Sequence, residues 1–174
     1  MKETLEYLFE GNTLSREQAK EILLGVGTGK YNEMAFASFL TIFKMRPIVS
    51  EELAGFRNAM AELSLQTDLS EYNAIDVVGT GGDEKNTFNI STLACFVIAG
   101  AGVNVTKHGN YAVSSTSGSS NLLEKLGYKF SNDIGKLKND LDKGNFCFMH
   151  APLFHPAMKH IAPARAALKV PTFF

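Results

Sequence analysis

The hydrophobic pattern changes near residue 73, and this change constrains the fold more than any other feature of the sequence. Before it, apolar residues recur every three or four positions, which is the period of an amphipathic helix. After it, short β-branched runs such as residues 74–78 alternate with glycine-rich turns and helical segments, a pattern typical of α/β domains. The sequence therefore predicts a separate all-α bundle over residues 1–65 and an α/β domain with a mainly parallel sheet over residues 74–174.

Four helices are expected in the first 65 residues. Ser15 and Gln18 have the spacing of a capping box, so the second helix should begin between them. The third should finish near Pro47, because the residue before a proline avoids the helical region, and the fourth should begin at Ser50. The polar segment 64–73 carries no apolar period and is the expected linker.

The α/β part is expected to alternate strands and helices joined by parallel crossovers. The expected strands cover residues 74–78, 103–106 and 146–149, and the expected helices cover residues 91–99, 119–126 and 134–143. Residues 170–174 finish on an apolar pair, Phe173 and Phe174, with no cap, turn or polar tail, so we expect an incomplete sheet with an open edge and exposed apolar surface.

Charge and cysteine content narrow the classes of protein. The 17 Lys plus Arg balance 18 Asp plus Glu, which gives a net charge of -1 and no general attraction to nucleic acid or to an anionic membrane. The first ten residues mix charged and apolar positions and form neither a signal peptide nor a membrane span, so we expect a cytoplasmic protein. Cys95 and Cys147 form no CxxC motif and are expected to be reduced core thiols.

A glycine-rich loop, Gly79–Asp83, follows the first predicted strand and precedes the helix that begins near Asn89. Glycines let a backbone approach a ligand closely, and a helix start offers free N–H groups to an anion. The hydroxyls of Thr87, Ser91 and Thr92 add donors. A tight turn without a ligand is the alternative. The Walker and Rossmann patterns are not matched, so neither ATP nor NAD is predicted.

A second polar cluster, Lys107–Asn110 followed by the serine-rich residues 114–119, comes at the end of the next predicted strand. Ligands of open α/β sheets bind beyond the carboxyl ends of the strands, so both clusters should face one crevice. Lys107 would supply a positive charge for a phosphate or diphosphate. A solvated lysine and a flexible serine loop are the alternatives.

Three histidines, His150, His155 and His160, recur every five residues. Residues five apart diverge widely around a helix, and Pro152 and Pro156 interrupt any continuous helix here. We therefore predict no histidine metal site.

Taken in order, Gly79–Asp83, Asn89–Thr92, and Lys107–Asn110 with Ser114, Ser115 and Gly118 resemble the signatures of the anthranilate phosphoribosyltransferases. The resemblance extends to Pro163–Arg165 and covers essentially the whole chain. It implies transfer of a phosphoribosyl group from phosphoribosyl diphosphate to the amine of anthranilate, a step of tryptophan biosynthesis that uses Mg²⁺. It also implies a homodimer formed through the helical domain, in which Phe36, Phe39 and Phe43 could be partly interface.

The resemblance assigns site residues. The residues implied for phosphoribosyl diphosphate are Gly79, Gly82, Asp83, Thr87, Asn89, Ile90, Ser91, Thr92, Lys107, His108, Gly109, Asn110, Ser114, Ser115 and Ser119. Those implied for anthranilate are Gly79, Asn110 and Arg165, and Ser91 would meet the magnesium ion. His108 and His155 would line the anthranilate entrance or make structural hydrogen bonds. No catalytic base is named, because the attacking amine is already neutral.

Members of that family are about twice as long, and their later half supplies an acidic pair that binds magnesium. We therefore expect this chain alone to bind phosphoribosyl diphosphate weakly and not to turn over; a truncated gene, a fragment and a split enzyme all fit. Two other functions stay open at this point. One is a relative of the pyrimidine nucleoside phosphorylases, and the other is a non-catalytic relative that binds nucleic acid.

Overall fold

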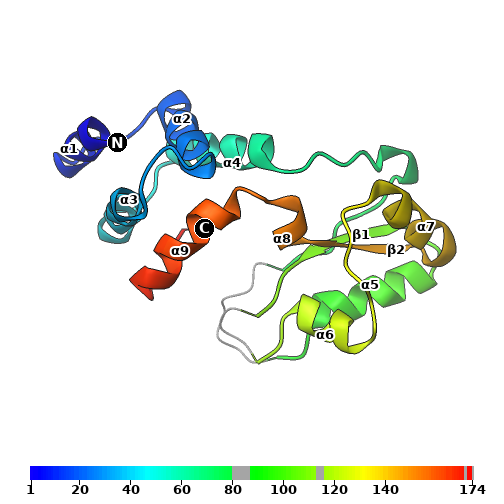
Figure 1. Cartoon of the computed structure of the whole chain (residues 1–174). Coiled ribbons are helices and arrows are strands. Elements are labelled where there is room, and N and C mark those ends of the chain that lie inside the picture. The colour runs from blue at the N-terminus through cyan, green and yellow to red at the C-terminus, as the bar shows by residue number, and fades with distance from the viewer. Residues whose placement is uncertain (80–86, 113–115, 171, 174) are drawn as a thin grey trace. The chain divides into compact units, whose positions relative to one another are not determined.

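The computed structural model describes residues 1–79, 87–112, 116–170 and 172–173. The chain forms two compact units: residues 1–64 with 155–174, and residues 65–154 (Figure 1). The predicted boundaries assigned residues 155–174 to the α/β part. The structure groups them with the helices.

The helical unit contains the four helices expected from the sequence. They are α1 (Lys2–Phe9), α2 (Arg16–Gly27), α3 (Glu33–Met45) and α4 (Ser50–Leu63). The predicted capping box is present, since Ser15 Oγ accepts from the Gln18 N–H and Gln18 Oε1 accepts from the Ser15 N–H at 2.9 Å. Phe36 and Phe39 are buried within the chain, so both belong to its core.

A fifth helix, α9 (Met158–Leu168), completes this unit and was not predicted. It buries Ile161 and Ala164 in the same hydrophobic cluster as α2 and α3, which explains why the segment joins the helical unit. Pro163 lies inside α9, so it removes one backbone donor without ending the helix. The Phe173 ring stacks on Phe56 with the ring centroids 5.0 Å apart.

A buried ion pair ties the loops of the helical unit together. Glu52 is 0% exposed, and its carboxylate accepts from the Arg46 guanidinium at 2.6 and 2.9 Å. It also accepts from the backbone N–H groups of Leu14 and Val49. Burial alone would raise the pKa of Glu52, but these hydrogen bonds and the Arg46 charge outweigh it and lower the pKa.

The α/β unit is built on two parallel strands, β1 (Val105–Gly109) and β2 (Phe146–His150), paired from Val105 with Phe146 to Gly109 with His150. Its helices are α5 (Ile90–Gly100), α6 (Ser119–Lys125), α7 (Ile134–Gly144) and α8 (Ala151–Phe154), with a 3₁₀ turn, η1 (Ser70–Tyr72). The parallel pairing of β1 and β2 confirms the prediction of parallel crossovers. Leu93 and Val97 of α5 are exposed.

The strand predicted over residues 74–78 is reduced to a single parallel bridge between Ile75 and Val105. Beyond that bridge, side chains take the place of backbone partners. The His108 N–H donates to the Asp76 carboxylate at 3.2 Å, and the Val77 carbonyl accepts from Lys107 Nζ at 2.7 Å. The strand prediction was therefore wrong beyond Ile75, because the side chains of Asp76 and Lys107 take hydrogen bonds that backbone groups would make in a sheet.

The segment expected to be a linker is fastened to the α/β unit. Its residue Tyr72 donates from its hydroxyl to Asp142 of α7 at 3.0 Å. The Leu65 N–H donates to the Phe154 carbonyl at 2.8 Å, a bond between the first and the last residue of the α/β unit.

Candidate anion-binding site

Lys107 is the central residue of the candidate site. It lies on β1 and is 1% exposed, and its Nζ donates to the Val77 carbonyl at 2.7 Å and to Ser91 Oγ at 3.3 Å. The solvated-lysine alternative is therefore wrong. Among the described residues, both hydrogen-bond partners of the ammonium are neutral oxygens, so its positive charge can still attract an anion.

The start of α5 lies beside this ammonium through Ser91. Ser91 and Thr92 occupy the first turn, where backbone N–H groups have no partner within the helix. Thr92 is 0% exposed, and its Oγ1 has no hydrogen-bond partner among the described residues. The helix start therefore adds dipole, backbone donors and hydroxyls to the charge of Lys107.

Glycines allow the loop after β1 to pass close to α6. A Cβ at Gly109 would collide with Ser119 Oγ and would lie 2.9 Å from the Phe148 ring. A Cβ at Gly118 would lie 2.7 Å from the Asn110 carbonyl oxygen. Both positions therefore need a residue without a side chain. The close approach makes Asn110 and Ser119 neighbours.

Asparagine side chains join the loops. Asn89, the residue before α5, donates from Nδ2 to the Gly118 carbonyl at 3.2 Å, which links the two polar clusters. Asn121 Oδ1 accepts from the N–H groups of Ala112 and Gly118, each at 3.0 Å. The sequence analysis predicted no role for Asn121 or Asp76. Asp76 could have been noticed, because an acidic residue is unusual within a β-branched run.

The other predicted ligand residues are distributed as follows. Gly79 approaches Ser91 Oγ, since a Cβ there would lie 3.9 Å away. Thr87 is exposed, and His108 and Asn110 lie at the end of β1 and just after it. The predicted residues Gly82, Asp83, Ser114 and Ser115 lie outside the described residues.

Arg165 lies on α9 in the helical unit, whereas Gly79 and Asn110, its predicted partners around anthranilate, lie in the α/β unit. Its side chain is partly buried and donates from Nε to Thr172 Oγ1 at 3.1 Å.

Magnesium needs hard oxygen ligands in an octahedral arrangement. Ser91 Oγ is an oxygen of this kind, but the described residues contain no group of three or more His, Cys, Asp or Glu that could hold a metal ion. Ser91 therefore fits an ion held mainly by diphosphate oxygens and water.

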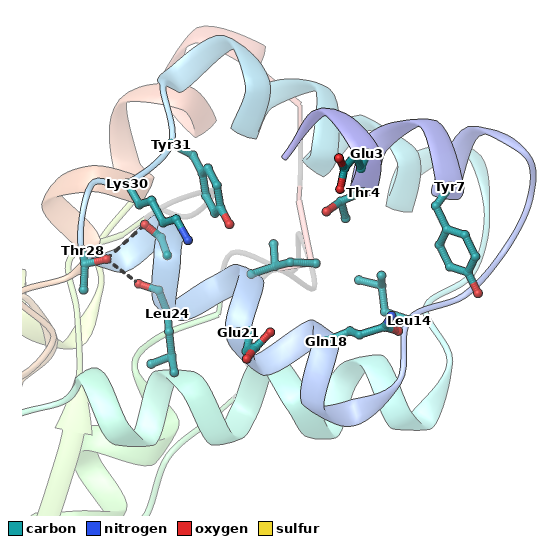
Figure 2. Close-up of a pocket in the computed structure, with 12 residues that line it drawn as sticks. Glu3, Thr4, Tyr7, Leu14, Gln18, Glu21, Leu24, Thr28, Lys30 and Tyr31 are labelled. Carbon is teal, nitrogen blue, oxygen red and sulfur yellow. Dashed lines mark hydrogen bonds between the residues drawn. The ribbon is translucent and has the colours of Figure 1, made fainter.

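A separate hollow of about 710 Å³ lies in the helical unit (Figure 2). Residues of α1, α2 and the following loop line it, including Tyr7, Glu21 and Tyr31. The Tyr31 ring lies against Gly25, where a Cβ would be 3.1 Å from the ring carbon Cζ. None of the predicted ligand residues lines this hollow.

Among the described residues, no helix combines the length and the apolar character that crossing a membrane requires.

Fold and candidate site together define the class: a helical bundle joined to a parallel α/β unit whose strand ends gather groups suited to a phosphorylated ligand. The chain belongs to the glycosyl transferase family, because residues 2–64 match the helical bundle domain of that family and residues 71–174 match its a/b domain.

Curated relatives are anthranilate phosphoribosyltransferases. That of Christiangramia forsetii is 56% identical over 100% of this chain and 53% of the relative, and that of Flavobacterium psychrophilum is 58% identical over the same shares. The chain thus spans about half the length of the curated relatives it matches.

Solved structures of this kind are also similar. The anthranilate phosphoribosyltransferase of Thermus thermophilus matches with a TM-score of 0.86 and 37% identity over 97% of this chain and 51% of that one. The Saccharomyces cerevisiae enzyme, in complex with phosphoribosyl diphosphate (PRPP) and Mg, matches with a TM-score of 0.81 and 32% identity over 91% of this chain and 48% of that one.

Proposed function

We propose that this chain is the N-terminal part of an anthranilate phosphoribosyltransferase, which transfers the phosphoribosyl group of phosphoribosyl diphosphate to the amine of anthranilate. The products are N-(5-phosphoribosyl)anthranilate and diphosphate. The observation that carries the proposal is the buried Lys107 ammonium beside Ser91 at the start of α5. The relatives named above support it.

The main chemical demand is the negative charge of the leaving diphosphate. Lys107 and the N–H groups at the start of α5 would bind that charge, and both are already fixed in place, so little reorganisation is needed as charge develops. Mg²⁺, held by the diphosphate and by Ser91 Oγ, would neutralise a further part of the charge. Thr87, Asn89, Thr92 and Ser119 would bind the rest of phosphoribosyl diphosphate.

Anthranilate carries a carboxylate and an amine. The amine must lie next to C1 of the ribose for the reaction to occur. In the proposal, Arg165 pairs with the carboxylate, while Gly79 and Asn110 orient the ring. The neutral amine attacks C1 as the bond to diphosphate breaks, and the positively charged nitrogen then loses its proton to water. No side chain of this chain is assigned as the base.

The proposal includes the setting of the enzyme: a cytoplasmic homodimer formed through the helical unit, without affinity for nucleic acid or membranes. The balanced net charge of -1 supports the last point. Since the chain spans about half the length of its relatives, we expect it to bind phosphoribosyl diphosphate weakly and to need the remaining half for turnover.

Isothermal titration of the full chain with phosphoribosyl diphosphate and Mg²⁺ tests the proposal. Saturable binding that is lost in Lys107→Met and kept in Lys129→Met, a substitution of an exposed lysine in the same unit, is the expected result. Equal binding by both variants would contradict the role of Lys107.

Turnover is tested by following the depletion of anthranilate with and without the C-terminal half of a relative. Arg165→Ala should abolish any turnover that is seen.

A further inference from the structure

His150, the last residue of β2, makes a buried contact that the proposed function does not use. Its Nδ1 lies 2.9 Å from the hydroxyl oxygen of Ser120, the second residue of α6. Ser120 is 0% exposed and His150 is 6% exposed, so water cannot easily replace either partner. Removing one member would leave the other buried and unsatisfied, and the bond therefore ties α6 to β2 specifically.

Aromatic rings hold the imidazole in one orientation. Phe130 stacks on His150 with ring centroids 4.3 Å apart and planes 15° apart, and Tyr111 meets the same ring edge-on at 5.0 Å. Burial lowers the pKa of His150, and the Glu124 carboxylate opposes this only in part. A neutral imidazole has one acceptor and one donor nitrogen, so it can form a single defined bond with a hydroxyl.

The start of α6 acts as a template for the loop that follows β1. Ser119 Oγ and the Ser120 N–H both donate to the Asn110 carbonyl, at 3.3 and 3.1 Å. Asn121 Oδ1 accepts two further backbone N–H groups of the same loop. The loop position thus depends on α6, and the Ser120–His150 bond fixes α6 to the strand.

We propose that His150 is a positioning residue: through Ser120 and Tyr111 it holds the start of α6 and the loop after β1 where Ser119 and Asn110 can meet the ligand. Its effect on phosphoribosyl diphosphate rests on the proposed function. Its effect on the loop is a property of the α/β unit and can be measured without any ligand.

Three substitutions in the full chain separate the contacts of His150. His150→Phe keeps an aromatic ring and removes the hydrogen bond, whereas His150→Asn keeps a polar atom near the place of Nδ1 and removes the ring. Ser120→Ala removes the other partner. Tyr72→Phe is the matched control, because it removes a hydroxyl bonded to α7 of the same unit and leaves α6 untouched.

We expect amide hydrogen exchange over residues 110–112 and 116–121 to become faster in His150→Phe and Ser120→Ala but not in Tyr72→Phe. The Kd for phosphoribosyl diphosphate with Mg²⁺ should rise roughly 3- to 10-fold in the same two variants, as expected for one buried hydrogen bond. The double variant should bind no more weakly than the weaker single variant, since no unsatisfied partner remains. His150→Asn should recover part of the affinity, and the ¹⁵N shift of His150 Nδ1 should move in Ser120→Ala.

Unchanged exchange over residues 110–112 and 116–121 in His150→Phe, or fully additive losses in the double variant, would overturn the proposal. So would faster exchange with an unchanged Kd, because the loop would then not position the ligand. If the unmodified chain binds no phosphoribosyl diphosphate, the proposed function fails for this chain, while the exchange and ¹⁵N measurements still decide whether His150 holds the loop. Should His150→Phe not fold, Ser120→Ala provides the same readouts.

Discussion

Lys107 Nζ donates to the carbonyl oxygen of Val77 at 2.7 Å, at a point where a backbone N–H would continue the sheet. The lysine therefore takes the place of a backbone partner for residue 77, and its charge is buried inside the α/β unit. Burying an ammonium that has no carboxylate partner costs stability. Among the described residues, no ion pair involves Lys107.

Lys107→Met should raise the free energy of unfolding, by about 1 kcal/mol, while it removes anion binding. The Met side chain fills similar space and needs no hydrogen bonds. Chemical denaturation of both proteins, next to the binding titration, measures the two effects. A variant that loses stability together with binding would show that Lys107 is primarily structural.

Glu52→Gln should destabilise the helical unit by about 3 kcal/mol, because it leaves the Arg46 guanidinium without its carboxylate and weakens two backbone hydrogen bonds. The matched control is Glu51→Gln on the same helix. Glu51 forms an exposed pair with Arg16, and its loss should cost about 0.5 kcal/mol or less. Similar losses in the two variants would contradict the special role of the buried pair.

The same carboxylate predicts a pH dependence. The folded-state pKa of Glu52 is lowered, so its contribution to stability is fully present above the ordinary carboxyl pKa of about 4.3 and is lost as the pH falls through the folded value. The free energy of unfolding should therefore decline below about pH 5. Glu52→Gln should show a shallower decline in the same denaturation series, and an identical slope would argue against this assignment.

Gly109→Ala should displace α6 and cost about 1 to 3 kcal/mol, because the new methyl group meets the Phe148 ring and Ser119. Gly144→Ala at the end of α7 is the opposite case, since nothing lies within 4 Å of the added Cβ. It should stabilise the chain by about 0.5 to 1 kcal/mol. Thermal unfolding of both variants gives the comparison, and a neutral Gly109→Ala would show that α6 can move aside freely.

Both cysteine thiols should resist alkylation in the folded chain. Cys95 and Cys147 are each 0% exposed, and burial raises the pKa of Cys147 to about 12, so almost no reactive thiolate is present at neutral pH. Mass spectrometry after a thiol reagent should find neither residue modified until denaturant is added. Rapid labelling of Cys147 in native buffer would show that the α7–β2 packing opens readily.

Local patterns predicted much of the fold. The apolar period and the Ser15–Gln18 capping box located the first helices, since the forces that start a helix act within a few residues. The alternation of short apolar runs and helical segments predicted the parallel pairing of β1 and β2. The glycines at 109 and 118 were part of a recognised motif, and the structure adds the steric reason for each.

The rest depended on partners distant in sequence. Lys107 is buried and donates to the carbonyl of Val77, 30 positions away in the sequence, and no local pattern predicts either the burial or the partner. The hydrogen bond between Ser120 and His150 also joins residues 30 positions apart, and neither the sequence around Ser120 nor that around His150 predicts it. The sequence by itself determined the first four helices, the parallel pairing of β1 and β2 and the order of the polar loops. Only the tertiary structure decided which polar groups are buried together, because desolvation and competition for hydrogen-bond partners are properties of the packed chain.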